Sequence, residues 1–215
     1  LGDGTFLDVS EAAGVSAHTG YGLGVVAADF DDDGHVDIFV ANDHQANFMW
    51  LNEGDGTFRE AGLETGVAYN AAGMHEAGMG IICEDLDEDA DVDLIITHFS
   101  GETNTLYRND GYEFLDVSDA SRIAAYAGRS MGLTSADVDS DGDTDVFVGN
   151  DLQENLLFLN QGGGTFEEAA LFNGVACDLG GVPQRTMGVE CCDYDNDARL
   201  DFYATSYLRQ LAVLY

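Results

Sequence analysis

Lysine is absent from this 215-residue sequence, and seven arginines stand against 41 aspartates and glutamates. The formal net charge is −34 at pH 7. A field of this sign repels the phosphates of nucleic acids and anionic membrane surfaces, so neither is expected as a partner. It attracts cations instead. Part of the acidic excess is also typical of a surface adapted to high salt.

Several other features are scarce. Pro183 is the only proline, and no run of about 18 apolar residues could span a membrane. No secretory signal peptide is visible. The chain opens at Leu1 without a methionine, so we expect a processed product or a segment of a longer protein. No N-x-[ST] sequon occurs, which predicts no standard N-glycosylation.

Cysteine is limited to four positions, Cys83, Cys177, Cys191 and Cys192. Four cysteines permit two disulfides or none, and their spacing does not fit a zinc site. Cys191 and Cys192 are neighbours on an expected strand and point to opposite faces, so a bond between them is not expected. A bridge from Cys177 to either one stays open. We interpret Cys83 as a small buried residue of an inner strand.

One acidic motif is present four times. It reads "DFDDDGHVD" at 29–37, "DLDEDADVD" at 85–93, "DVDSDGDTD" at 137–145 and "DYDNDARLD" at 193–201. A repeat at intervals of roughly 50 residues indicates a repeat architecture. An apolar run of β type follows each copy, and the first three copies continue into a second run and a glycine-rich turn. Each unit is therefore predicted to be a meander of four strands, with the acidic loop between strands one and two.

Four short antiparallel strands at this period are typical of a β-propeller blade. The predicted fold class is all-β: a β-propeller of four-stranded antiparallel blades, with DxDxDGxxD calcium loops between strands 1 and 2. The chain, 1–215, is expected to be one propeller or propeller segment. Its units are placed at about 22–60, 78–116, 130–168 and 186–215, with 1–10 as an extra outer strand. Connections near 61–77, 117–129 and 169–186 are expected to hold helical turns opposite the acidic loops.

The acidic loops have the composition of a calcium site. Aspartates at positions 1, 3, 5 and 9 of a tight loop converge, and residue 7 offers its backbone carbonyl, which together form an oxygen shell that suits Ca²⁺ better than Mg²⁺. Up to four Ca²⁺ ions are predicted. The apolar residue at position 2 is expected to anchor each loop to its blade. The predicted ligands are Asp29, Asp31, Asp33, His35 and Asp37; Asp85, Asp87, Asp89, Asp91 and Asp93; Asp137, Asp139, Asp141, Asp143 and Asp145; and Asp193, Asp195, Asp197, Arg199 and Asp201. His35, Asp91, Asp143 and Arg199 take part through the carbonyl.

The loops are not equivalent at position 6, which holds Gly34 and Gly142 in two loops and Ala90 and Ala198 in the others. Glycine suits the sharp turn of such a loop, whereas alanine is penalised at positive φ. Arg199 also brings a positive charge close to the fourth loop. Weaker sites, or a distorted turn, are therefore predicted in the second and fourth loops, and the first and third sites are predicted to be the tighter pair.

The DxDxDGxxD loops and the "NxGDGTFxxV"-like turns resemble FG-GAP/VCBS-type repeats, and the pattern "GMG…D…NDxxxNxLYxNDGxxFxDVS" resembles the acidic extracellular propellers related to cartilage acidic protein. The resemblance covers the whole chain. It implies a calcium-binding propeller, usually seven-bladed, secreted or on a cell surface, and often adhesive, with calcium ligands in the four loops. The literal Phe-Gly and Gly-Ala-Pro signatures are missing, and four units are too few for seven blades.

The two ends of the chain each hold part of a repeat unit, and the two parts complement each other. "LGDGTFLDVS" at the start reads as a fourth strand, and "RQLAVLY" at the end reads as a third strand. Three interpretations stay open: a window of a longer propeller, a four-bladed ring, or a head-to-tail filament in which one copy completes the next.

The expected function is an extracellular module for adhesion, structure or surface assembly, whose partner is a protein or glycan ligand or other copies of itself. No G-x-S-x-G or comparable motif is present, and the five histidines occupy non-equivalent, surface or turn-like positions, so an enzyme is not expected. The alternatives are a filament subunit and the propeller of a carbohydrate-active enzyme. A ligand surface, if present, is expected on the long connections, at Tyr21, Tyr69, His75, Tyr126, Arg129 and Arg185.

Overall fold

The computed structural model describes residues 2, 4–99 and 101–215. Its main strands form four antiparallel sheets in which the strands follow one another in chain order, as the repeat predicts. Unit 1 contains β1 (Gly22–Ala28), β2 (Asp37–Asn42), β3 (Phe48–Asn52) and β4 (Phe58–Glu60). Unit 2 contains β5 (Gly78–Glu84), β6 (Asp93–His98), β8 (Thr105–Asn109) and β9 (Phe114–Asp116). Unit 3 contains β11 (Ser130–Ala136), β12 (Asp145–Asn150), β13 (Leu156–Asn160) and β14 (Phe166–Glu168). Unit 4 contains β15 (Thr186–Cys192), β16 (Asp201–Ser206) and β17 (Val213–Leu214).

Short helical turns lie in the connections between the units, as expected. They are α1 (Gly62–Thr65), α2 (Ser118–Ser121) and α3 (Ala170–Asn173), with 3₁₀ turns η1 (Val15–Ala17) and η2 (Ile123–Ala125). A small sheet pairs β7 (Glu102–Thr103) with β10 (Ala127–Gly128). In the described part of the chain no helix is long and apolar enough to cross a bilayer.

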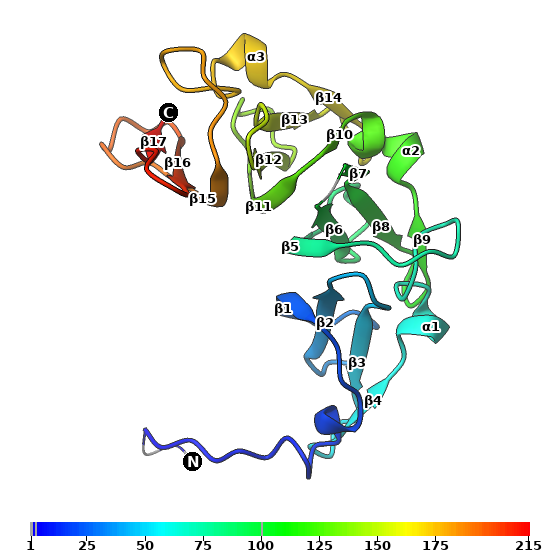
Figure 1. Ribbon diagram of the computed structural model, residues 1–215. Coiled ribbons are helices and arrows are strands. Elements are labelled where there is room, and N and C mark those ends of the chain that lie inside the picture. Colours follow the sequence, from blue (N-terminus) through cyan, green and yellow to red (C-terminus); the bar gives the residue numbers. More distant parts are fainter. Residues whose placement is uncertain (1, 3, 100) are drawn as a thin grey trace.

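The units follow one another along an open arc, with the first strand of each unit on the inner side (Figure 1). Neighbouring inner strands contact each other directly, and a repeated glycine makes this approach possible. A Cβ on Gly24 would lie 2.6 Å from the Met79 carbonyl oxygen, and one on Gly80 would lie 2.6 Å from the Met131 carbonyl oxygen. The small residue at this inner-strand position therefore has a steric cause.

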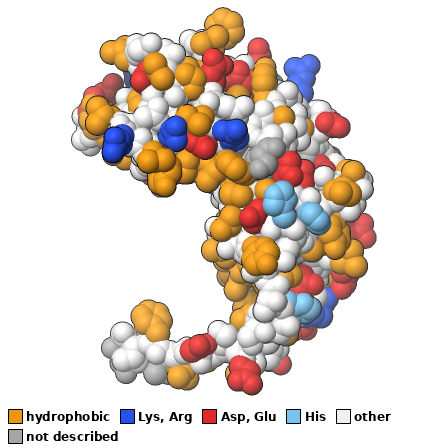
Figure 2. All heavy atoms as spheres, in the orientation of Figure 1, with side chains coloured by type: hydrophobic (Ala, Val, Ile, Leu, Met, Phe, Trp, Pro, Cys, Tyr) orange, Lys and Arg blue, Asp and Glu red, His pale blue; other side chains and the backbone are white. Residues whose placement is uncertain are grey.

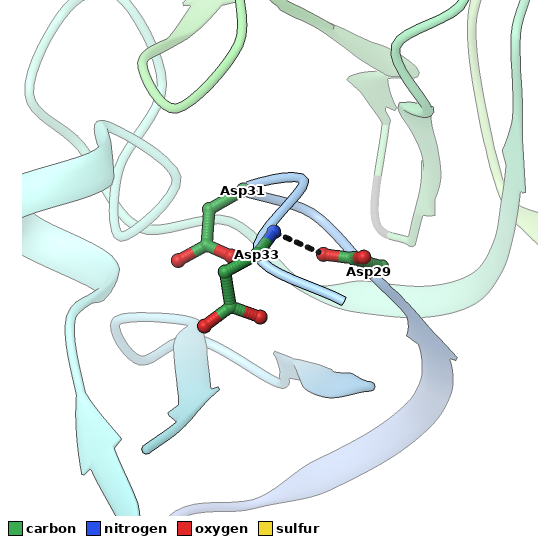
Figure 3. A group of neighbouring side chains, drawn as sticks. All are labelled: Asp29, Asp31 and Asp33. Atoms are coloured by element: carbon green, nitrogen blue, oxygen red, sulfur yellow. Dashed lines mark hydrogen bonds between the residues drawn. The ribbon is translucent and has the colours of Figure 1, made fainter. Parts of the chain in front are cut away.

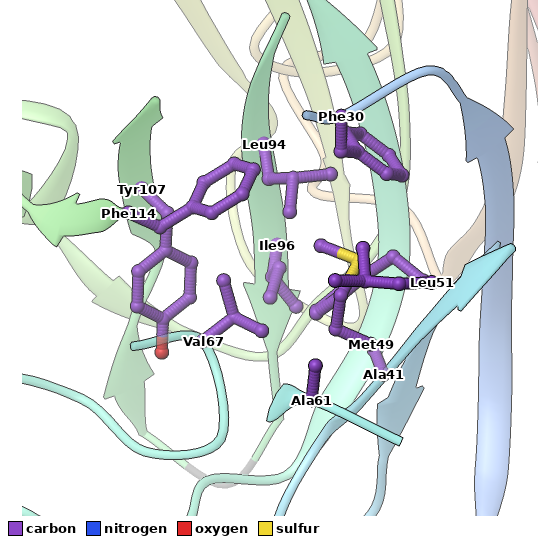
Figure 4. Packing of buried hydrophobic residues seen from close by; sticks show 11 residues of the cluster. Phe30, Ala41, Met49, Leu51, Ala61, Val67, Leu94, Ile96, Tyr107 and Phe114 are labelled. Carbon is purple, nitrogen blue, oxygen red and sulfur yellow. The ribbon is translucent and has the colours of Figure 1, made fainter. Parts of the chain in front are cut away.

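The hydrophobic cores lie between units rather than within them. Phe39 and Met49 of unit 1 pack with Leu94 and Tyr107 of unit 2 (Figure 4). A second core joins units 2 and 3, and a third joins units 3 and 4. A single sheet buries neither face alone, so adjacent units stabilise each other.

The N-terminal segment differs from its prediction. Residues 1–10 were expected to form an outer strand, but described residues 2 and 4–10 pair with no strand, and Phe6 is 99% exposed. A fourth strand needs a third strand beside it, and the β16–β17 pair that would supply one belongs to the opposite end of the arc (Figure 1). The described residues therefore do not form the four-bladed ring.

The four cysteines are all free, so the bridge left open for Cys177 is not formed. Cys83 is half-buried on β5, close to the expected environment, and Cys192 is exposed.

A substitution tests the steric role of the inner glycine. Gly80→Ala should lower the free energy of unfolding by about 1–3 kcal/mol, because the new Cβ overlaps the backbone of the next inner strand. Gly188 holds the same repeat position, but its Cβ would meet only Thr205 Oγ1, at 3.3 Å. Urea unfolding should show a clearly smaller loss for Gly188→Ala. Equal losses would contradict this explanation.

Candidate metal centres

The acidic motifs form four short loops where the first strand of each unit turns into the second. We call them loop 1 (29–37), loop 2 (85–93), loop 3 (137–145) and loop 4 (193–201). In each loop, oxygens of three carboxylates lie within 4.8 Å of one another. Figure 3 shows the group of loop 1, gathered around one tight turn. The groups are Asp29, Asp31 and Asp33; Asp85, Asp87 and Asp93; Asp137, Asp139 and Asp145; and Asp193, Asp195 and Asp197.

Positions 1 and 3 of the predicted ligand set thus meet in every loop. The third carboxylate is position 5 in loops 1 and 4, and position 9 in loops 2 and 3. The other predicted carboxylates at these two positions belong to the same loops but stand outside the closest groups. They are Asp37, Asp89, Asp141 and Asp201.

The aspartates themselves shape the loop backbone. In loop 1, Asp29 accepts hydrogen bonds from the backbone N–H groups of Asp33 (3.1 Å) and Gly34 (2.9 Å). Asp33 accepts one from the N–H of His35 at 2.8 Å. The same three bonds recur in the other loops. Local side-chain bonds of this kind replace regular secondary structure in tight turns.

Position 6 is left-handed in all four loops. Its φ is 87° at Gly34, 79° at Ala90, 102° at Gly142 and 69° at Ala198. The positive φ expected for the two alanines is confirmed. An L-residue in this conformation costs about 1–2 kcal/mol, so loops 2 and 4 carry backbone strain at position 6 that loops 1 and 3 avoid.

The aspartate at position 9 fastens each loop to its sheet. Asp37 is fully buried, and its two oxygens accept the N–H groups of Phe30 (2.9 Å) and Asn52 (2.7 Å). Asp93 and Asp145 repeat this arrangement. Burial raises the pKa of Asp37 and Asp145, and raises that of Asp93 to about 7, against the opposing effect of these hydrogen bonds.

The aspartate at position 3 has an oxygen with no partner. Asp31 Oδ1 and Asp87 Oδ1 are buried and make no hydrogen bond. Burial raises the pKa of both side chains, and neighbouring carboxylates raise it further, while the positive charge of Arg108 opposes the rise at Asp87. A buried, unpartnered carboxylate oxygen is costly unless a cation lies beside it.

Protein side chains do not supply that cation. Within the described residues, the ion pairs of arginine and histidine go to other acidic groups, such as Arg59 with Glu53 and Glu64, and none reaches a loop aspartate. The donor set of carboxylate oxygens, the orphaned oxygens and the lack of a direct ion pair among the described residues all fit a hard divalent cation.

The side chain at position 7 lies over the turn between the third and fourth strands. A Cβ on Gly54 would collide with the His35 ring. A Cβ on Gly111 would lie 3.8 Å from Asp91 Oδ2, and one on Gly162 would lie 3.7 Å from Asp143 Oδ2. The contact with His35 excludes a side chain at Gly54, whereas at Gly111 and Gly162 the positive φ of 86° and 88° favours glycine. The contribution of the position-7 carbonyl to a metal site stays a prediction.

Sequence reasoning missed a repeated asparagine that ends the third strand, Asn52, Asn109 and Asn160. Its backbone N–H holds the position-9 aspartate, and its side-chain amide bonds loop carbonyls. The signal was present, because this asparagine recurs in register after each third-strand run.

One histidine is buried, although all five were expected at surface or turn-like positions. His98 is 2% exposed on β6, and its Nε2 lies 3.0 Å from Thr105 Oγ1, which in turn donates to Glu76 Oε2 at 3.0 Å. Burial lowers the pKa of His98 to about 4, so the imidazole is neutral at pH 7 and its 3.5 Å contact with Glu76 is not an ion pair.

The residues expected to form a ligand surface lie on separate connections. Tyr21, Tyr69 and Tyr126 are exposed by 67, 38 and 47%. His75 and Arg129 are exposed, and Arg185 is half-buried.

Comparison with known proteins agrees with the repeat. The model of the FG-GAP-like repeat matches residues 29–78, 85–148 and 137–204. Cartilage acidic protein 1 of Homo sapiens is 30% identical over 146 residues, which is 66% of this chain and 21% of that protein. The Mus musculus protein is 28% identical over 146 residues, or 66% of this chain and 22% of its own length. The chain thus spans about a fifth of these relatives.

A likeness in fold alone extends to a solved structure, BBS1N in complex with ARL6DN. It has a TM-score of 0.51 at 11% identity, over 87% of this chain and 51% of that one. The sequence match, the repeated sheets and the four loops lead to one assignment: the chain belongs to the family of FG-GAP-like repeat proteins.

Proposed function

We propose that this chain is a calcium-binding module of the extracellular space, and that its four units are blades of a β-propeller. The observation that carries the proposal is the buried, unpartnered oxygen of Asp31 and Asp87 within carboxylate groups that make no ion pair with a described protein side chain. Ca²⁺ accepts six to eight oxygen ligands in flexible geometry, which suits these loops better than the strict octahedron of Mg²⁺.

The open arc formed by the four units supports the propeller geometry. The inner strands face its hollow, which Figure 2 shows bordered by hydrophobic side chains. Leu23 and Val25 of β1 are 60 and 67% exposed. In a closed propeller, such side chains would border the central channel and come close to the strands of further blades.

Bound calcium would act on structure rather than on chemistry. Each ion would offset two negative charges of its loop and hold the ends of the first and second strands together. The module would then serve adhesion, structure or surface assembly, with a protein or glycan ligand or other copies as partner. The charge of −34 and the relatives named cartilage acidic protein support an extracellular, acidic setting.

Catalysis is the weaker candidate. The described polar arrangement closest to a catalytic one is His98, Thr105 and Glu76, but the Thr105 side chain is 2% exposed and already donates its proton to Glu76. The hydroxyl that would have to act as the nucleophile is therefore already engaged by Glu76.

Removal of calcium tests the proposal. Thermal melting should shift down by several degrees on addition of excess EDTA, because a ligand at 100 times its Kd stabilises the folded state by about 2.7 kcal/mol per site. Added Mg²⁺ should restore little of the loss. Superimposable melting curves with calcium and with EDTA would overturn the proposed function.

The backbone at position 6 predicts a ranking of the sites. Ala90→Gly should raise the calcium affinity of loop 2 roughly tenfold, because glycine removes about 1–2 kcal/mol of strain at φ 79°. Gly34→Ala should weaken loop 1 similarly, and no other atom lies within 4 Å of its Cβ position, so only φ changes. Calorimetric titration of the parent chain should resolve two classes of site. Four equal sites would contradict the ranking.

A further inference from the structure

The loops do not stand alone, because residue 2 of loops 1, 2 and 3 packs in a core shared with the next unit. Phe30 of loop 1 is 2% exposed, and its ring packs edge-on against Phe114 of β9, with centroids 6.0 Å apart. Leu86 of loop 2 is 1% exposed and lies in the core shared by units 2 and 3. Each of these side chains therefore fixes its loop to the following sheet.

The backbone of the same residue makes a second contact. The Asn109 side-chain amide donates to the Phe30 carbonyl oxygen at 3.0 Å and to the Val92 carbonyl oxygen at 3.3 Å. Phe30 is position 2 of loop 1, and Val92 is position 8 of loop 2. One amide group thus bonds two acidic loops that lie 56 residues apart in sequence.

The arrangement repeats one unit later. The Asn160 amide donates to the Leu86 carbonyl of loop 2 at 2.9 Å and to the Thr144 carbonyl of loop 3 at 3.3 Å. The glycine turn of unit 3 also lies against loop 2, since a Cβ on Gly164 would be 3.4 Å from Asp87 Cβ.

Asn52 provides an internal comparison. It occupies the same position in unit 1, and its amide donates to the Val36 carbonyl of its own loop at 3.0 Å. Its Oδ1 accepts the Gly54 N–H, as Asn160 Oδ1 accepts the Gly162 N–H, both at 3.1 Å. The bond to a preceding loop is what distinguishes Asn160 from Asn52 among the described residues.

The bonded carbonyls sit beside the groups that would hold the ion. The Phe30 N–H donates to Asp37, and residue 30 lies between Asp29 and Asp31. Val92 directly precedes Asp93. An ion that orders loop 1 would therefore also fix the Phe30 carbonyl. Since this carbonyl accepts the Asn109 amide, the amide would then be held in place for its second bond, to the Val92 carbonyl of loop 2.

We propose that the side-chain amides of Asn109 and Asn160 are positioning residues that couple calcium binding in neighbouring loops, loop 1 with loop 2 and loop 2 with loop 3. This inference rests on the proposed function, since it requires that the loops bind calcium. The coupling is positive, because an amide already ordered by one loop lowers the cost of ordering the next.

The test follows each loop separately by its position-6 amide, which bonds the position-1 aspartate: Gly34 for loop 1 and Ala90 for loop 2. Calcium titrations of the ¹⁵N-labelled 215-residue chain give an affinity at each amide. Asp31→Asn removes one negative charge and so weakens calcium binding in loop 1. The substitution costs no hydrogen bond at Oδ1, because Asp31 Oδ1 has no hydrogen-bond partner. In this variant the affinity at Ala90 should fall about fivefold or more.

The same substitution should leave the affinity at Ala90 unchanged when it is made in an Asn109→Ala chain. Through-space charge effects are common to both backgrounds and cancel in the comparison. In an Asn52→Ala chain the fivefold fall should persist, because that amide bonds only its own loop. If Asn109→Ala does not fold, Asn160→Ala with Asp87→Asn gives the same cycle, read at Gly142.

The outcomes separate the two proposals. If no loop amide of the parent chain shifts with calcium, the proposed function fails. If the amides shift but Asp31→Asn lowers the affinity at Ala90 equally with and without the Asn109 amide, or not at all, the coupling is refuted and calcium binding stands.

Discussion

In units 1 to 3, the buried aspartate at position 9 is the constraint on which the rest of the unit depends. Its two oxygens hold the N–H of residue 2 and the N–H of the asparagine that ends the third strand, as in Asp37 with Phe30 and Asn52. This places a negative charge in the protein interior, where it is unfavourable without a partner. The sequence offers few basic side chains, and the ion pairs of Arg59 and Arg108 go to Glu53, Glu64 and Asp110 rather than to this aspartate. The geometry that gives the unit its shape thus creates the need for a cation.

Residue 2 carries the effect of each loop into the next unit. The Phe30 side chain enters the core between units 1 and 2, while its carbonyl accepts the Asn109 amide. Since the cores lie between sheets, stability depends mainly on contacts between neighbours, as in other repeat proteins. The inner glycines serve the same end, because they bring adjacent inner strands into backbone contact. The acidic loop, the hydrophobic core and the asparagine hydrogen bond therefore all stabilise the interface between one unit and the next.

Much of the fold could be predicted from the repeat, because the strand pattern, the turn glycines and the loop aspartates recur at equivalent positions of each unit and act locally. The sheet order, the helical turns and the left-handed φ of Ala90 and Ala198 could all be predicted. The burial of His98 and the two-loop bonding of Asn109 could not, because both depend on contacts across the sheet or between units. The absence of a strand at 4–10 has the same cause: its motif is that of a fourth strand, but such a strand needs a neighbouring third strand that its position in the arc does not provide.

The most direct measurement is anomalous diffraction from crystals of this chain grown with Ca²⁺. The account predicts an ion in loops 1 and 3 at least, bound by the aspartates at positions 1 and 3, with position 5 in loop 1 and position 9 in loop 3. Metal–oxygen distances should be about 2.3–2.6 Å. It also predicts that the Asp31 Oδ1 atom, unpartnered here, becomes a ligand. Loops that keep the same backbone and hold no ion at millimolar calcium would contradict it.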